Sequence, residues 1–398
     1  MCNIKLETKV IANSDAPSVP QTRNNMQYRT LTRDKLKVSA LGFGCMRLPT
    51  LKSGKVDQEE AVRMLRHGID SGINYIDTAA PYHDGDSEKV VGKALKDGYR
   101  DKVLIADKFP TWEATKKSDL DRIFNEQIAK LGVDCIDVYL LHCLHKRLMD
   151  SVKKFEMIDW IVKKREQGKI RYLGFSFHDD LPLFREIVDM FDWDVCQIQY
   201  NYVNETTQAG TEGLKYAAKK GLSTIIMEPL FGGALANPVG KLAGVFKKHK
   251  ENSVDLALRW LWDKPEVALV LSGMSNMEQT VQNLEIAGRS GVETFTGKEQ
   301  TVIAEAQKVY GESLPIPCTK CGYCLPCPFD VDIPSNFELY NSMSAMPETA
   351  SLMKNIYAMF NSNRQASHCT ECGQCEQKCP QHLTIPQFLK QVDKALRG

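Results

Sequence analysis

The chain alternates short apolar segments, rich in β-branched residues, with longer polar segments of helical period. Eight such apolar segments follow one another at a spacing of roughly 30 residues, which is typical of strand–helix units. Between them, segments such as 57–71, 118–131 and 151–167 repeat apolar residues at helical spacing. The eight predicted strands span residues 41–46, 73–77, 103–107, 135–141, 170–175, 195–199, 223–227 and 267–271.

Strands that alternate with helices predict a parallel sheet, and eight such units close into a barrel more readily than into an open sheet. No Gly-x-Gly-x-x-Gly motif follows the early strands, which argues against a doubly wound dinucleotide-binding sheet. Residues 26–40 alternate around a polar centre and predict a hairpin ahead of the barrel. We therefore expect an α/β fold with a (β/α)8 TIM barrel at 26–311, preceded by an N-terminal extension at 1–25.

Composition changes this picture little. Lys and Arg total 51 against 50 Asp and Glu, a formal net charge of +1. This balance excludes the strong positive field that attracts nucleic acid or an anionic membrane, so neither is an expected partner. No apolar segment approaches the ~18 residues of a membrane span, and no apolar signal core begins the chain. We therefore expect a cytoplasmic protein.

Eight of the 13 cysteines form two compact groups that each end in Cys-Pro. The second group reads C-x2-C-x2-C-x3-C-P, the run that holds cubane iron–sulfur clusters, and the first is one residue shorter in its last gap. A disulfide framework is disfavoured in a reducing cytosol, whereas a zinc site built from Cys-x2-Cys pairs stays open as an alternative. The predicted ligands are Cys318, Cys321, Cys324, Cys327, Cys369, Cys372, Cys375 and Cys379.

In two-cluster ferredoxins the fourth cysteine of each run binds the other cluster. The same crossing here joins Cys379 to the first group and Cys327 to the second. The 41 residues between the groups include two segments of helical pattern. We therefore expect a small, mainly α-helical ferredoxin-like domain at 312–398 with two [4Fe–4S] clusters. Since such clusters exchange single electrons, a redox partner protein is also expected.

Polar residues stand at the ends of three consecutive predicted strands. The second strand ends at Asp77, with Tyr82 on the loop that follows, and the third and fourth strands run into Lys108 and His142. In barrels of this kind the chemistry sits at the carboxyl ends of the strands. The four side chains are therefore expected at one mouth of the barrel.

These four residue types suit the reduction of a carbonyl by hydride, because the developing alkoxide needs a proton donor. A lysine cation lowers the pKa of a neighbouring tyrosine, an aspartate keeps the lysine charged, and a histidine orients the substrate oxygen. We therefore expect Tyr82 to be unusually acidic. Each residue alone has an ordinary structural explanation, such as helix capping by Asp77, but the four together favour catalysis.

At these positions the chain resembles the aldo/keto reductase family, in the branch with a C-terminal ferredoxin-like iron–sulfur domain. The resemblance is carried by L-G-F-G-C-M-R-L-P, G-I-N-Y-I-D-T-A-x-x-Y, L-L-H, G-F-S, V-C-Q-I-Q-Y-N and S-G-M-S-N-M-E-Q-T-V-Q-N. It implies that a nicotinamide-dependent oxidoreductase interconverts a small-molecule carbonyl and an alcohol. Tyr82 is then the general acid/base, and Asp77, Lys108 and His142 complete a catalytic tetrad. The implied cofactor contacts are Gly44, Cys45, Met46, Ser176, Gln197, Met227, Ser272, Gly273, Gln282 and Asn283.

The cofactor segments depart from the family pattern in three ways. Phe177 stands where an asparagine usually follows the serine, and Met227 stands where an aromatic ring usually stacks on the nicotinamide. No Lys or Arg lies between Ser272 and Asn283, where the family usually binds the 2′-phosphate, so NADP and NAD both stay open. The alternative function is an electron-transfer or redox-sensing iron–sulfur protein whose barrel has little or no reductase activity.

Overall fold

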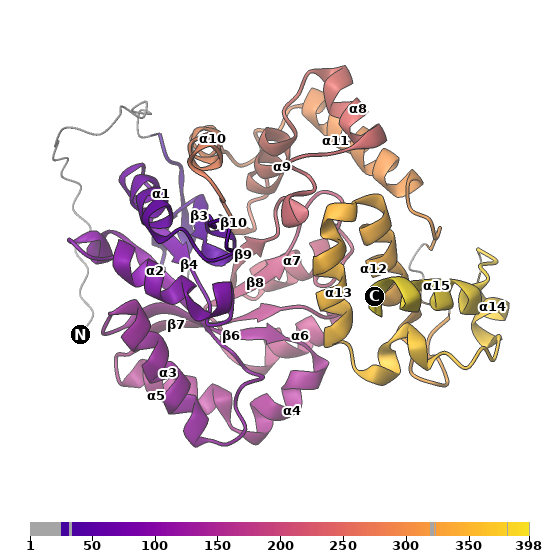
Figure 1. The fold of residues 1–398 in the computed structure, drawn as a ribbon, viewed down its shortest axis with the longest axis horizontal. Helices are drawn as coiled ribbons and strands as arrows, with labels where there is room; N and C mark the ends of the chain where they lie inside the picture. Colours follow the sequence, from indigo (N-terminus) through magenta and orange to yellow (C-terminus); the bar gives the residue numbers. More distant parts are fainter. Residues whose placement is uncertain (1–24, 32–33, 319–321, 323, 380, 398) are drawn as a thin grey trace. The chain divides into compact units, whose positions relative to one another are not determined.

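Eight parallel strands close into a barrel in the computed structural model, which describes residues 25–31, 34–318, 322, 324–379 and 381–397. The strands follow one another around the barrel in chain order, and β10 closes it by pairing with β3 (Figure 1). The predicted (β/α)8 TIM barrel is therefore confirmed. The predicted extension at 1–25 lies outside the described residues, apart from residue 25.

Each of the eight predicted apolar segments forms a strand, with small shifts at the ends. The strands are β3 (Leu41–Gly44), β4 (Tyr75–Asp77), β5 (Leu104–Phe109), β6 (Ile136–Leu144), β7 (Ile170–Phe177), β8 (Val195–Gln199), β9 (Ser223–Met227) and β10 (Val267–Ser272).

The predicted hairpin precedes the barrel and covers the end at which several strands begin. It consists of β1 (Tyr28–Leu31) and β2 (Leu36–Ser39). Leu31 and Val38 of this hairpin belong to the same buried apolar cluster as Tyr75 and Leu104, the first residues of β4 and β5. Because this end is filled with apolar side chains, the polar strand ends are left at the opposite mouth.

Helices follow the strands as the sequence pattern predicts, with one difference. The segment 151–167, expected as a single helix, is divided between two helices. The break falls at Glu156, whose φ of 52° is left-handed and cannot continue an α-helix. The helices in this part of the chain are α1 (Gln58–Asp70), α2 (Ser87–Ala94), α3 (Ser118–Leu131), α4 (Lys146–Lys154), α5 (Met157–Glu166), α6 (Leu181–Met190), α7 (Gly210–Lys219), α9 (Ser253–Trp262) and α10 (Met277–Ala287).

The chain forms two compact units that differ from the predicted division at residue 311. The barrel unit holds residues up to 229 and 257–295, while residues 230–256 and 296–398 form the second unit. One reason lies in α8 (Gly240–His249) and α11 (Gly297–Glu312), which pack together and are joined by an ion pair of 2.9 Å between Lys248 and Glu305.

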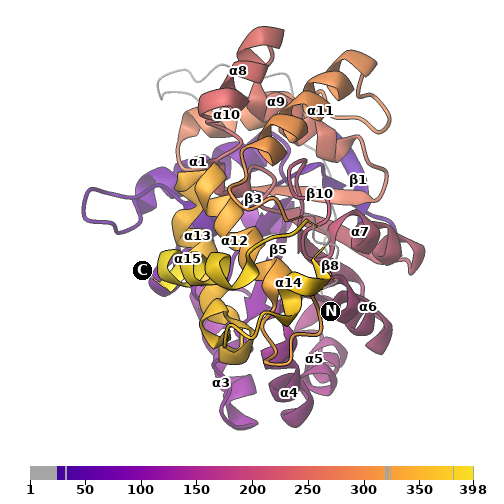
Figure 2. The ribbon, with the colours of Figure 1, turned by 90° about the vertical axis from the view of Figure 1, so that its right-hand side faces the viewer.

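The C-terminal part of the second unit is mainly helical, as expected. Figure 2 shows α12 (Ile333–Ala345), α13 (Ala350–Met359) and α15 (Ile385–Arg397) gathered together, and all three contact one another. The short α14 (Gln374–Lys378) lies within the second cysteine group. None of the helices in the described part of the chain combines the length and the apolar character that a membrane span requires.

Candidate active site and cysteine-lined hollows

Asp77, Tyr82, Lys108 and His142 lie together at the mouth of the barrel. Asp77 ends β4, and Lys108 and His142 lie near the ends of β5 and β6. The Nζ of Lys108 donates hydrogen bonds to Oδ1 of Asp77 at 2.5 Å and to the carbonyl of Thr78 at 2.8 Å. This nitrogen also lies 4.8 Å from the centre of the Tyr82 ring, which meets the His142 ring edge-on at 6.1 Å. The structure therefore brings the four predicted residues into one group.

The ammonium group of Lys108 is buried, with only 1% of the side chain exposed. Burial alone lowers the pKa of a lysine, but Asp77 and Tyr82 outweigh it and hold the pKa of Lys108 above its ordinary value. Burial raises the pKa of Asp77, and the charge of Lys108, followed by hydrogen bonds from Lys108 and Gln197, opposes this rise. Lys108 is consequently charged, and its ammonium group lies beside the carboxylate of Asp77 and the phenol ring of Tyr82.

Tyr82 is less acidic than the sequence led us to expect. The residue as a whole keeps part of its surface exposed, yet loss of hydration around its phenol raises the pKa to about 12. Lys108 lowers this pKa, as expected, but its effect is smaller than that of burial, and Asp77 adds to the rise. The expectation of an unusually acidic phenol was therefore wrong for the free protein. Tyr82 is a protonated phenol at neutral pH.

His142 is a neutral imidazole at neutral pH. Burial, followed by the charge of Lys108 and the neighbouring His178, holds the pKa of His142 well below its ordinary value. Its Nδ1 has no hydrogen-bond partner among the residues that the structure describes. Trp112, which the sequence places on the loop after Lys108, lies over the imidazole with ring centres 5.1 Å apart. The imidazole therefore keeps at least one ring nitrogen without a hydrogen bond to any of the described residues.

A backbone irregularity after His142 could not be read from the sequence. The pairing of β6 with β7 shifts register between Leu141 and Leu144. Within this bulge Cys143 has a φ of 58°, an uncommon conformation for a residue with a side chain. The N–H of Cys143 donates to Oγ of Ser176 at 2.7 Å, which satisfies the backbone group that the bulge removes from the ladder.

Two of the predicted cofactor residues, Ser176 and Gln197, are paired across β7 and β8 and are each 1% exposed. Because Oγ of Ser176 accepts the N–H of Cys143, its hydroxyl hydrogen can donate to another group. Nε2 of Gln197 lies 3.4 Å from Oδ2 of Asp77, and its Oε1 has no partner within the described residues. A donor and an acceptor are therefore placed side by side, as a primary amide would require.

A second set of predicted cofactor residues lies where β3 meets β10. Nδ2 of Asn283 donates to Oγ of Ser272 at 2.8 Å, and both residues are buried. A Cβ atom on Gly44 would lie 3.3 Å from the carbonyl oxygen of Ser272, and one on Gly273 would lie 3.2 Å from Cβ of Arg47. Both glycines therefore allow close packing of the loops at this side of the mouth.

The other predicted cofactor residues have mixed surroundings. Cys45 is fully buried, whereas Met46 beside it is 55% exposed. Met227 and Gln282 are both partly exposed. None of these four side chains is placed by a hydrogen bond to the tetrad. Their predicted contacts with a nicotinamide nucleotide stay predictions.

Glu228 was missed by the sequence reasoning, although it directly follows β9 and so obeys the same rule of strand ends. Burial raises the pKa of its carboxyl to about 7, and Arg47 partly opposes this rise. Its backbone, with a φ of 55°, is anchored by Asn201, whose Nδ2 donates to the Glu228 carbonyl at 3.2 Å. A carboxyl that titrates near neutral pH thus lies at the mouth.

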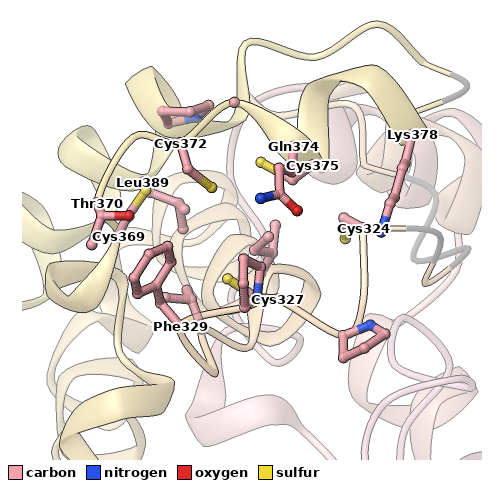
Figure 3. A pocket seen from close by; sticks show the side chains of 16 residues that line it. Cys324, Cys327, Phe329, Cys369, Thr370, Cys372, Gln374, Cys375, Lys378 and Leu389 are labelled. Carbon is pink, nitrogen blue, oxygen red and sulfur yellow. The ribbon is translucent and has the colours of Figure 1, made fainter.

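In the second unit, the cysteines line two hollows that meet at Cys324. The first hollow has a volume of about 400 Å3, including space open to solvent, and the second has about 330 Å3. Figure 3 shows the first hollow, with sulfur atoms from both cysteine groups around it. The first is lined by Cys324, Cys327, Cys369, Cys372 and Cys375, and the second by Cys318, Cys324 and Cys379.

This distribution matches the predicted crossing at Cys327 and Cys379, whereas Cys324 lines both hollows. Cys327 lies with the second cysteine group, close enough to Cys369 to raise the pKa of that thiol, after burial. Cys379 lies with the first group. The predicted ligand Cys321 lies outside the described residues. Cysteine sulfur is the donor that cubane clusters use, although in this structure no three Cys, His, Asp or Glu side chains of the described residues are close enough together to hold a metal ion.

Comparison with known proteins agrees with both halves of this description. The model of the aldo/keto reductase family matches residues 40–290, more than half of the chain. The chain belongs to the aldo/keto reductase family. Residues 317–384 match the 4Fe-4S dicluster domain, so this aldo/keto reductase carries a C-terminal iron–sulfur domain and is an oxidoreductase. The resemblance stated from the sequence is therefore confirmed.

Individual relatives cover the barrel. L-galactose dehydrogenase of Arabidopsis thaliana is 28% identical over 311 residues, 71% of this chain and 94% of the relative. The holo form of the aldo-keto reductase AKR11C1 from Bacillus halodurans has a TM-score of 0.58 at 25% identity, covering 71% of this chain and 96% of that one. An aldo/keto reductase from Klebsiella pneumoniae in complex with NADP and acetate has a TM-score of 0.57 at 24% identity, over 73% and 96% of the two chains. The last likeness shows the fold alone.

Proposed function

We propose that this aldo/keto reductase reduces a small-molecule carbonyl compound to an alcohol with NADPH or NADH. The observation that carries the proposal is the buried ion pair of Lys108 and Asp77 beneath the ring of Tyr82. A buried ion pair adds little net stability at the mouth of a barrel, because removing two charges from water costs about as much free energy as their attraction returns. Its value lies in stabilising negative charge on the phenol as the proton leaves.

The proton chemistry follows from the states of the side chains. Tyr82 is protonated at neutral pH and donates its phenol proton to the carbonyl oxygen as that oxygen gains negative charge. Lys108 then stabilises the phenolate, and Asp77 keeps Lys108 charged and oriented. Neutral His142 hydrogen-bonds the same substrate oxygen. Because the pKa of Tyr82 is raised, the protonated form that reduction needs is the form present at neutral pH.

The residues at the mouth fit a nicotinamide. Ser176 and Gln197 offer a donor and an acceptor to a carboxamide, and the buried Oε1 of Gln197 needs such a partner. Asn283 and Ser272 would contact the nucleotide. When bound, the cofactor supplies the hydride. No Lys or Arg lies between Ser272 and Asn283, so the proposal includes both NADP and NAD as the nucleotide.

We also propose that the C-terminal domain holds two [4Fe–4S] clusters with crossed ligation. Cys369, Cys372, Cys375 and Cys327 would hold one cluster, and Cys318, Cys321, Cys324 and Cys379 the other. The two hollows, which share Cys324, support two clusters rather than one. Iron and sulfide analysis of anaerobically purified protein should therefore find twice the content of a single cubane. Content for one cluster alone would refute the second site.

The reductase proposal is tested with Tyr82→Phe, which removes only the proton donor. We expect oxidation of NADPH or NADH with a carbonyl panel to fall by about 100-fold or more, the usual value of a positioned acid. Nucleotide binding, measured by fluorescence titration, should change little. Tyr99→Phe is a matched control, because it removes a hydroxyl bonded to Asp70 away from the tetrad. Turnover that survives Tyr82→Phe, or wild-type protein that binds neither nucleotide, would contradict the proposal and favour the electron-transfer alternative.

A further inference from the structure

Lys378 carries the only charge among the described residues that line the first hollow. The rest of that lining consists of cysteines, prolines, a glycine, apolar side chains and the neutral Thr370 and Gln374. Lys378 ends α14, and Figure 3 shows its side chain extending from the helix toward Cys324. Lys378 forms no ion pair with any residue that the structure describes. The charge of Lys378 is therefore not neutralised by a described side chain and can act on a group bound in the first hollow.

Neighbouring charges do not cancel this one. Glu371 lies between two of the cysteine ligands in sequence, but its carboxylate pairs with Lys390 at 2.7 Å and does not line the hollow. Glu371 instead contributes its backbone N–H, which lies 3.4 Å from Sγ of Cys369. Glu376, next to Cys375, does not line the hollow either. Lys378 is therefore the one charged side chain among the described residues that line the first hollow.

A cluster bound by four thiolates is an anion, and its reduction adds one further negative charge. A cation beside it stabilises the reduced form more than the oxidised form, because Coulomb energy grows with the charge of the partner. The reduction potential rises as a result, in the way that surrounding charges and hydrogen bonds tune other iron–sulfur sites. Lys378 is exposed, so water screens its effect and keeps the magnitude modest.

We propose that Lys378 is a tuning residue that raises the reduction potential of the cluster held by Cys327, Cys369, Cys372 and Cys375. The proposal rests on the proposed occupancy of the first hollow by a [4Fe–4S] cluster. The second hollow shows no equivalent residue: its described lining is apolar apart from cysteines, a glycine and Gln381. The larger effect of Lys378 is therefore assigned to the cluster of the first hollow, which Lys378 lines, and a smaller effect on the other cluster follows from the direction of its side chain toward Cys324, which lines both hollows.

The test is an anaerobic redox titration of the full-length protein with dithionite, followed by electron paramagnetic resonance. Cys372→Ser changes one ligand of the first hollow and identifies which reduction step belongs to its cluster. In Lys378→Met we expect the midpoint of that step to fall by about 59 mV, a tenfold change in the equilibrium of a one-electron couple. Lys378→Glu should lower it further, and Lys378→Arg should leave it near the wild-type value.

Lys394→Met is the matched control, because Lys394 is an exposed lysine of α15 that lines neither hollow. It should leave both midpoints unchanged. Iron and sulfide content is measured for every variant, so that loss of a cluster is told apart from a shift in its potential. The proposal is overturned if Lys378→Met, with full cluster content, leaves the identified step unmoved or shifts it no more than Lys394→Met does. A wild-type protein without a cluster in the first hollow would instead refute the proposed function.

Discussion

The buried ion pair of Lys108 and Asp77 makes the sharpest prediction about this barrel. At 2.5 Å and an effective dielectric constant of about 20, two unit charges attract each other by about 7 kcal/mol. Most of this attraction offsets the cost of removing both charges from water. Breaking such a pair from one side costs about 3–5 kcal/mol, because it leaves one buried charge without a partner. We therefore expect Lys108→Met to lower the free energy of unfolding of the barrel by that amount at neutral pH.

The loss should depend on pH in a defined direction. Burial already raises the pKa of Asp77, and removing Lys108 raises it further. A carboxyl whose folded pKa lies above its unfolded value contributes stability that is present below the unfolded pKa and is lost as the pH rises through the folded pKa. At acid pH the unpaired Asp77 of the variant takes up a proton, so most of the loss of stability disappears. The deficit of Lys108→Met should thus shrink from neutral toward acid pH.

Urea unfolding followed by tryptophan fluorescence measures this deficit selectively, because all five tryptophans lie in the barrel unit. Asp77→Asn should also destabilise, and the double variant should lose about 2–3 kcal/mol less than the sum of the single losses. The control is Lys102→Met, which breaks the exposed pair with Asp70 and should cost less than about 1 kcal/mol. The reasoning is refuted if Lys108→Met costs no more than Lys102→Met at neutral pH, or if its cost does not change with pH.

Two further predictions concern close packing at a glycine and a buried carboxyl group. A Cβ atom on Gly92 would lie 2.6 Å from the carbonyl oxygen of Lys130, so Gly92→Ala should cost about 1–3 kcal/mol in thermal unfolding, whereas Gly244→Ala, with open space around it, should not destabilise. Burial, followed by Glu88, holds the pKa of Asp107 well above its ordinary value, so this carboxyl contributes stability that is lost as the pH rises through the folded pKa. Glu88→Gln removes the like charge, so the loss of stability with rising pH should become smaller in urea unfolding measured across pH. An unchanged dependence on pH would contradict the role given to Glu88.

The position of the four residues that we propose to be catalytic could be predicted from the sequence because it depends on local pattern. Eight apolar segments separated by helices determine a closed parallel barrel, and such a barrel places strand ends at one mouth. Asp77, Lys108 and His142 follow from that rule alone. The cysteine groups are equally local, because the spacing of the predicted ligands can be counted along the chain.

The pKa values and the hydrogen-bond partners of those groups were decided by the tertiary structure. The pKa of Tyr82 depends on how much water its phenol keeps, which is set by elements distant in sequence, and burial there outweighs Lys108. The bulge at Cys143, the contact of Gln197 with Asp77 and the carboxyl of Glu228 at the mouth likewise require the folded barrel. The strand segments and the cysteine spacings are local patterns, so they can be read directly from the chain. The hydration and the protonation of a side chain depend on all of its neighbours, and only the closed fold brings those neighbours together.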